Sequence, residues 1–171
     1  MPKLYIFAGL PGSGKTALAR QLARRLNAFY LRIDTIEQAL RDLCNVRVSG
    51  EGYRLAYRIA ADNLQLGLEV VVDSCNPIEL TRREWEDVAF ANGATYINIE
   101  AVCSDADEHR RRVESRASDI PGLTLPTWDD VVAREYHDWT RDRIIVDTAN
   151  RTAKVSFDLL LEKLDIAKEP Q

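Results

Sequence analysis

The chain has 171 residues, enough for one domain with its own buried core, and a formal net charge of −4. Apolar residues make up 46% and charged residues 29%, which is typical of a soluble globular protein and offers no broad basic surface for a nucleic-acid backbone. The three cysteines are widely separated and form no CxxC pair, so they speak against a disulfide framework and a zinc site and favour a reducing, cytoplasmic setting.

An apolar run at residues 4–8 predicts the first strand, and it leads directly into GLPGSGKT at residues 9–16. This short run is not expected to be a signal peptide or a membrane span. GxxxxGKT between a strand and a helix is the pattern of a phosphate-binding loop, whose backbone N–H groups surround the phosphates of a nucleoside triphosphate. Lys15 is expected to reach the outer phosphates and Thr16 to bind Mg²⁺. The predicted nucleotide-binding residues are Gly9, Gly12, Ser13, Gly14, Lys15 and Thr16.

Helices and strands alternate through the rest of the chain. Leu18, Leu22 and Leu26 recur every fourth residue and predict an amphipathic helix after the loop. Further strands are expected at residues 29–33, 69–73, 95–103 and 143–147. Further helices are expected from residue 34, over 53–66, 77–93 and 104–116, from 127 towards 139, and over 153–167, with a mobile loop at 117–126. The alternation predicts a three-layer α/β fold with a five-stranded parallel sheet, in one domain of residues 1–171.

Asp34 follows the second predicted strand, at the edge where open α/β sheets gather their ligands. A carboxylate at this edge is well placed to accept the proton of an acceptor hydroxyl during phosphoryl transfer. The spacing from Asp34 to Glu37 is also that of a helix cap, and the two roles can coexist.

Two more polar residues follow the third predicted strand. Asp73 ends this strand beside the phosphate-binding loop, and together with Thr16 it is the expected magnesium site. Asn76 either caps the next helix or contacts a ligand. Trp85, Trp128 and Trp139 are expected to pack against helices rather than to stack on a base.

The predicted helix 104–116 is rich in basic residues. His109, Arg112 and Arg116 share one face through their i+3 and i+4 spacing, so they form a row that can cover a bound triphosphate. The alternative is a solvated charged face, partly neutralised by nearby glutamates. Because the arginines directly precede a loop with prolines and glycine, the segment 109–127 is predicted to be a lid, with Arg112 and Arg116 as catalytic residues.

The chain resembles the small P-loop kinases related to the kinase domain of polynucleotide kinase and, more distantly, gluconate kinase, shikimate kinase, zeta toxin and chloramphenicol phosphotransferase. The resemblance covers nearly the whole chain and rests on GLPGSGKT at 9–16, Asp34, VVVDSCNP at 70–77, HRRRVESR at 109–116 and IVDTAN at 145–150. It implies a nucleoside-kinase-like fold with a helical lid, and it implies ATP and Mg²⁺ as cofactors.

The same resemblance implies roles for individual residues. Asp34 would activate the acceptor hydroxyl, and Arg112 and Arg116 would grip the nucleotide phosphates. The loop 148–150, with Asn150, would lie near the adenine, and Arg110 is a candidate to stack on the base.

The chain departs from the polynucleotide kinases at Glu37. Those kinases place an arginine three residues after the aspartate to hold a phosphate of the acceptor strand, whereas a carboxylate would repel such a phosphate. A nucleic-acid end is therefore less favoured as the acceptor than a small molecule with a free hydroxyl. The acceptor pocket is expected in the segment 47–58, where the candidates are Tyr53, Arg54, Tyr57 and Arg58.

The resulting prediction is a cytoplasmic ATP-dependent kinase, a monomer or homodimer without a membrane partner, that phosphorylates a small-molecule hydroxyl. The alternatives are a polynucleotide 5'-hydroxyl kinase, a zeta-toxin-like nucleotide-sugar kinase, and a nucleotide-binding ATPase switch that acts through a partner protein. A pure switch needs no acceptor base, so Asp34 and the lid arginines favour phosphoryl transfer.

Overall fold

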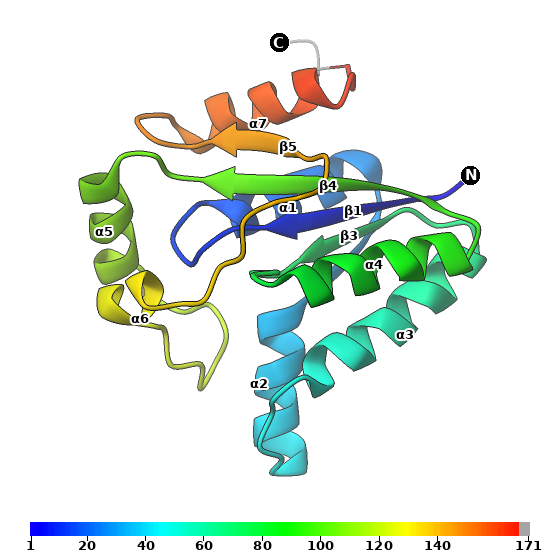
Figure 1. The fold of residues 1–171 in the computed structure, drawn as a ribbon, viewed down its shortest axis with the longest axis horizontal. Coiled ribbons are helices and arrows are strands. Elements are labelled where there is room, and N and C mark those ends of the chain that lie inside the picture. Colours follow the sequence, from blue (N-terminus) through cyan, green and yellow to red (C-terminus); the bar gives the residue numbers. More distant parts are fainter. Residues whose placement is uncertain (168–171) are drawn as a thin grey trace.

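The core of the molecule is a single sheet of five parallel strands in the order β2-β3-β1-β4-β5 (Figure 1). The structure is a computed structural model that describes residues 1–167, so the last four residues of the expected domain, 168–171, lie outside the described part. The strands are β1 (Lys3–Ala8), β2 (Phe29–Arg32), β3 (Val70–Asp73), β4 (Thr95–Val102) and β5 (Ile144–Asp147). The predicted five-stranded parallel sheet is confirmed.

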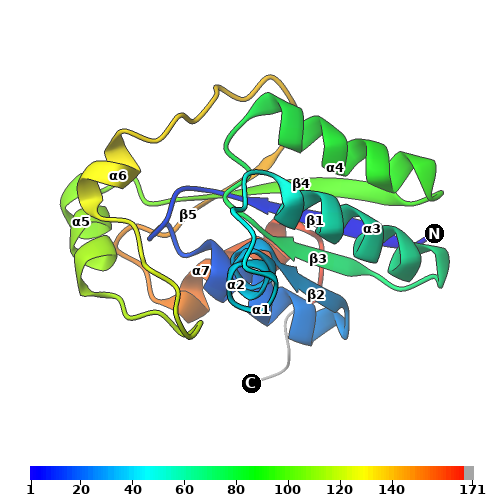
Figure 2. The same cartoon turned by 90° about the horizontal axis from the view of Figure 1, so that it is seen from below.

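Helices cover both faces of this sheet and make three layers (Figures 1 and 2). One face is covered by α1 (Lys15–Leu26) and α7 (Ala153–Lys163), and the other by α3 (Glu51–Gln65) and α4 (Glu79–Ala91). Successive side chains of a strand point to opposite faces, so Leu4 and Ile6 of β1 join the α3–α4 core. Tyr5 and Phe7 join the α1–α7 core. Burial on both faces explains the continuous apolar run of β1.

The remaining helices lie around the carboxyl ends of the strands. α2 (Ile33–Cys44) directly follows β2, while α5 (Ala106–Ser115) and α6 (Trp128–Val132) lie beyond the ends of β4 and β5 (Figure 1). The loop 117–126 runs from α5 towards α2, where a Cβ on Gly122 would come 3.1 Å from Nε2 of Gln38. No helix within residues 1–167 is both long and apolar enough to cross a membrane.

The helix expected from residue 127 towards 139 ends at Val132 instead. The chain beyond it is held by a buried carboxylate: Tyr136 Oη and Trp139 Nε1 donate to Glu100 Oε1 at 2.9 and 2.8 Å. Arg143 Nε donates to Glu100 Oε2 at 2.5 Å. Helix propensity is a weak preference, and here these contacts with a distant strand override it.

Asn76 is not the cap of the helix that follows it, because α4 begins at Glu79 with Ile78 as its N-cap. Asn76 is fully buried in a left-handed conformation with φ of +47°. Its N–H donates to Tyr53 Oη at 3.1 Å, and its carbonyl oxygen accepts from Nε of the buried Arg82 at 3.1 Å. The residue shapes the turn after β3.

Candidate active site

The phosphate-binding loop packs closely against β4 and α5. Gly9 has a φ of +139° and Gly12 a φ of +86°, which lie in the region that favours glycine. A Cβ on Gly9 would lie 2.3 Å from the carbonyl oxygen of Ala101, and a Cβ on Gly12 would lie 2.6 Å from Cγ2 of Val113. The backbone path and its neighbours both require glycine, as a loop that wraps a phosphate does.

Two cavities meet at the end of this loop. The phosphate-loop cavity has a volume of ≈ 490 Å³. It is lined by Gly12, Gly14, Lys15, Thr16, Ala17, Arg20, Arg112, Ser115 and Arg116. The Asp34 cavity, of ≈ 450 Å³, extends from the same Lys15 and Thr16 to α2 and the loop 117–126. Lys15, Thr16 and Arg116 line both cavities.

The residues at this junction fit a nucleoside triphosphate. Lys15 is only 7% exposed, and no hydrogen bond or ion pair joins its ammonium group to the residues that the structure describes. The buried Ser13 Oγ also lacks a partner there. Buried polar groups are normally paired, so these two are suited to ligand oxygens.

Thr16 fits the expected Mg²⁺ ion, because magnesium in kinase sites takes one or two protein oxygens together with phosphates and water. Within residues 1–167 no cluster of three or more His, Cys, Asp or Glu side chains is arranged to hold a metal ion. Asp73, the other expected ligand, is 2% exposed and accepts a hydrogen bond from Tyr30 Oη at 2.7 Å. Arg32 Nε lies 3.7 Å from the same oxygen, and Asp73 does not line either cavity. Its role at the metal stays a prediction.

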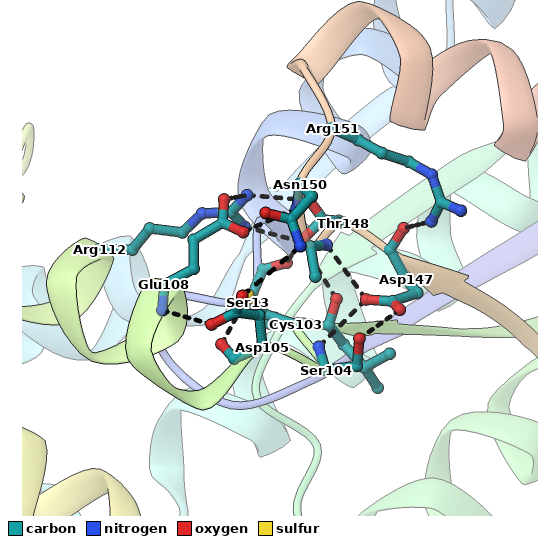
Figure 3. Close-up of polar contacts among 12 residues, drawn as sticks. Ser13, Cys103, Ser104, Asp105, Glu108, Arg112, Asp147, Thr148, Asn150 and Arg151 are labelled. Atoms are coloured by element: carbon teal, nitrogen blue, oxygen red, sulfur yellow. Dashed lines mark hydrogen bonds and ion pairs between the residues drawn. The ribbon is translucent and has the colours of Figure 1, made fainter.

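A polar network joins the phosphate-binding loop to α5 and the end of β5 (Figure 3). Thr148 Oγ1 donates to the carbonyl oxygen of Ser13 at 2.8 Å and accepts from Arg112 Nη1 at 2.7 Å. Arg112 Nη2 donates to the Thr148 carbonyl oxygen at 2.9 Å and pairs with Glu108 Oε1 at 2.6 Å. Arg112 is therefore held in place beside the loop by its own protein partners.

The same network fixes the segment that was expected near the adenine. Asn150 N donates to Glu108 Oε2 at 2.7 Å, which lowers the pKa of Glu108. Asp147 accepts from the Ser104 hydroxyl at 2.6 Å (Figure 3). Asn150 does not line either cavity, and Arg110 pairs with Glu114 at 2.8 Å. The adenine-side roles of Asn150 and Arg110 stay predictions.

The expected row of three cations along α5 is wrong at its first member. His109 is buried, its Nε2–H donates to the carbonyl oxygen of Pro11 at 2.8 Å, and its ring packs edge-on against Trp128. One side of α5 is thus docked on the phosphate-binding loop, directly through His109 and indirectly through Arg112, whose partner Thr148 binds Ser13. Arg112 lines the phosphate-loop cavity, and Arg116 lines both cavities.

Asp34 lines its cavity from the first turn of α2, and it does not cap that helix. The helix begins one residue earlier than expected, at Ile33, and its N-cap is Arg32, without a side-chain cap hydrogen bond. The side chain of Asp34 makes no hydrogen bond with the residues that the structure describes. Glu37, its expected capping partner, pairs with Arg41 at 3.3 Å instead. Burial raises the pKa of Glu37, and Arg41 opposes that change.

Arg116 lies between the phosphate-loop cavity and Asp34. The residue is partly buried, and its Nε has no hydrogen-bond partner. Burial lowers the pKa of Arg116, whereas the Asp34 carboxylate raises it. A cation that faces both Lys15 and the carboxylate is suited to an anion between them.

The segment 47–58 was expected to form the acceptor pocket, and its role there stays a prediction. Tyr53 and Tyr57 pack against the α3–α4 core, and Tyr57 Oη donates to Glu84 Oε2 at 2.9 Å. No residue of 47–58 lines the Asp34 cavity. Its walls are instead formed by Glu37, Gln38 and Arg41 of α2, by Gly122–Pro126 of the loop, and by Arg134.

A helical pattern could have identified part of this wall. Asp34, Glu37, Gln38 and Arg41 are spaced by three, four and seven residues and therefore share one face of α2. No sequence pattern points to Arg134 in the same way, because Arg134 reaches the cavity only as a result of α6 ending at Val132.

Asp119 ties the loop 117–126 to the rest of the site. Its carboxylate pairs with Arg20 of α1 and with Nη1 of Arg32 at 2.9 Å. Hydrogen bonds from Arg20 and Arg32 lower the pKa of Asp119 to about 2. Asp119 thus joins the loop 117–126 to α1 and β2 beside the Asp34 cavity, and the expected mobility of this loop stays a prediction.

Comparison with known proteins places this geometry in a recognised group. The family model described as an AAA domain matches residues 4–136. No curated protein sequence matches the chain. The Mycobacterium tuberculosis APS kinase CysC, in complex with AMPPNP and APS, superposes with a TM-score of 0.72 at 20% identity, covering 96% of this chain and 98% of that one.

Two further solved structures are similar over their whole length. A sugar kinase from Janibacter sp. HTCC2649 has a TM-score of 0.70 at 14% identity, covering 98% and 96% of the two chains. Kti12 from Chaetomium thermophilum, in complex with ADP-AlF3, has a TM-score of 0.67 at 22% identity, covering 96% and 100%. At these identities the likeness shows the fold, and it confirms the expected P-loop kinase architecture.

Proposed function

The chain belongs to the AAA domain family, and on that premise we propose that it is an ATP- and Mg²⁺-dependent kinase. It transfers the γ-phosphate of ATP to a hydroxyl group of a small acceptor bound in the Asp34 cavity. The observation that carries this proposal is the position of Asp34 in the cavity that also reaches Lys15, Thr16 and Arg116. Its carboxylate has no hydrogen-bond partner among residues 1–167.

In this reaction Asp34 accepts the proton of the acceptor hydroxyl. The acceptor oxygen then forms a bond to the γ-phosphorus, while the bond from that phosphorus to the bridging oxygen breaks and ADP leaves with the electron pair. Lys15 and Arg116 offset the negative charge on the transferring group, and Arg112 adds charge from its fixed position. Mg²⁺, held by the Thr16 hydroxyl and phosphate oxygens, would neutralise charge on the phosphates.

The same geometry argues against a switch that merely binds and hydrolyses ATP. A switch has no use for a second cavity or for a base beside it. A structural role in capping α2 would have explained Asp34 without any acceptor, but the helix uses Arg32 as its N-cap. Phosphoryl transfer accounts for both the cavity and the carboxylate.

The test is a screen of hydroxyl compounds with γ-labelled ATP, followed by a comparison of wild type with Asp34→Asn. Loss of the base should lower kcat with the true acceptor by about 10² to 10⁴. ATP affinity should stay unchanged, because Asp34 does not line the phosphate-loop cavity. Asp62→Asn on the exposed side of α3 is the matched control, and it should behave as wild type.

The alternatives give different results in the same experiment. Turnover of Asp34→Asn within a few-fold of wild type would disprove the proposed mechanism. ATP hydrolysis without any labelled acceptor would identify a switch. Growth arrest on expression of wild type, but not of Asp34→Asn, would point to a toxin that acts on a nucleotide sugar.

A further inference from the structure

We propose that the acceptor carries an anionic group of its own, a phosphate or a carboxylate, and that Arg134 binds this group at the mouth of the Asp34 cavity. This inference rests on the proposed kinase function and names the class of its substrate. It reverses the expectation that Glu37 excludes an anionic acceptor.

The first support is the balance of charge around the cavity. Two carboxylates, Asp34 and Glu37, line it, against five cationic side chains: Lys15, Arg32, Arg41, Arg116 and Arg134. Lys15 and Arg116 face the nucleotide phosphates. The remaining three cations are more than a neutral hydroxyl compound requires.

The second support is the way these three cations are partnered. Arg32 is engaged by Asp119 and Asp73, and Arg41 pairs with Glu37 at 3.3 Å. Arg134 makes no hydrogen bond or ion pair through its side chain with the residues that the structure describes. It is therefore the cation that is free to bind a ligand.

Glu37 does not cancel this positive charge. Its carboxylate lies on the same face of α2 as Arg41, which holds it by an i,i+4 ion pair. Burial raises the pKa of Glu37 and so disfavours its charged form, whereas the ion pair with Arg41 opposes that change. The repulsion that a bare glutamate would exert on an anionic acceptor is thus offset from within α2.

The third support is the rigid attachment of Arg134. On its N-terminal side, Thr127 and Asp130 form a capping box at the start of α6. On its C-terminal side, His137 N donates to the carbonyl oxygen of Pro77 at 2.8 Å, and Tyr136 binds the buried Glu100. The backbone of Arg134 is held between two anchors, which is how a binding residue is preorganised.

The experiment uses inorganic phosphate as the probe, added to the full chain saturated with AMPPNP and Mg²⁺ so that the nucleotide site is already filled. Wild type should bind phosphate about tenfold more tightly than Arg134→Gln, measured by calorimetry. Arg134→Lys should recover part of the affinity, because it restores the charge but not the planar guanidinium. Arg83→Gln, at an exposed arginine of α4, is the control and should match wild type.

Matched acceptors identify the anionic group. Glucose, glucose 6-phosphate and glucuronate are compared as acceptors and as ligands of the AMPPNP complex, and the preferred anion distinguishes a phosphate from a carboxylate. For the preferred anion, Arg134→Gln should raise KM or Kd about tenfold and leave the KM for ATP unchanged.

Two results would overturn the inference: equal phosphate affinity of wild type and Arg134→Gln, or transfer to a neutral acceptor that exceeds transfer to its anionic counterpart. Either would leave the kinase proposal intact. The kinase proposal fails separately, if AMPPNP itself does not bind or if Asp34→Asn remains active.

Discussion

The phosphate-loop side and the Asp34 side of the site are built in opposite ways. Around the phosphate-binding loop, the polar side chains of neighbouring elements already have protein partners: His109 binds Pro11, and Thr148 binds both Ser13 and Arg112. Around Asp34, three groups lack them, namely Asp34 itself, Nε of Arg116 and the guanidinium of Arg134. On the first side, folding completes the contacts that support the loop and leaves Lys15 and Ser13 Oγ for the ligand, whereas on the second side the three groups themselves need a ligand.

This difference teaches which substitutions should affect stability and which should affect only turnover. A partnered group contributes to the folded state, so its removal leaves another buried group unsatisfied. An unpartnered group in a cavity contributes little to folding and can even oppose it. Three substitutions test the distinction, in order of decreasing effect.

Arg116→Met should have the largest effect, and the effect should be on turnover. An arginine that stabilises a transferring phosphate is worth about 10³ or more in rate, so kcat should fall by roughly that factor. The melting temperature should stay the same or rise, because within residues 1–167 Arg116 has no ion pair and its Nε is buried without a hydrogen-bond partner. Arg111→Met, at an exposed arginine of the same helix, is the control. A marked drop in melting temperature for Arg116→Met would break the comparison between the two sides.

Thr148→Val, unlike Arg116→Met, should lower the stability of the fold. The residue is 4% exposed, and its hydroxyl both donates to Ser13 and accepts from Arg112. Loss of this hydroxyl should destabilise the fold by about 1 to 3 kcal/mol, measured by urea unfolding. ATP affinity should weaken as well, while the KM for the acceptor should not change. Thr95→Val, at an exposed threonine, should be neutral in both measurements.

The comparison also separates what the sequence could predict from what it could not. Local sequence patterns were enough to predict the strands, the phosphate-binding loop, Asp34 and Arg116. The structure places Asp34 and Arg116 in one cavity with the end of the loop. The wall formed by Arg134 depends on a distant contact. Glu100 of β4 holds the chain after Val132 and so ends α6 early, and no periodicity near Arg134 records this.

The absence of residues 47–58 from the wall of the Asp34 cavity has a similar physical cause. Tyr53 and Tyr57 have the chemistry of pocket residues, but α3 packs on the sheet and buries this side of the helix in the core. Local spacing also could not predict which residue pairs with Glu37, because Asp34 and Arg41 both lie at a distance in sequence that allows a contact along a helix. Only the helix start at Ile33 decides between them.

Asp119→Asn should have the smallest effect. Its side chain is 48% exposed, and ion pairs with that exposure contribute about 1 kcal/mol or less. The pKa of Asp119 is lowered from 3.8 to about 2, so the stabilisation by its ion pairs is present above the unfolded value and is lost only as the pH falls through about 2. The stability difference between wild type and Asp119→Asn should therefore be constant from about pH 5 to about pH 8. Asp62→Asn serves as the control, and a difference that changes over this interval would contradict the assignment.

The bond between Thr148 and Ser13 spans 135 residues of sequence. During synthesis the chain emerges from its N-terminus, so the phosphate-binding loop is exposed long before the residue that secures it has been made. We therefore expect nucleotide to stabilise the fold most once β5 has joined the sheet and Thr148 has bound Ser13. If ATP protects a growing chain against proteolysis, that protection should therefore begin at one of the last steps of folding.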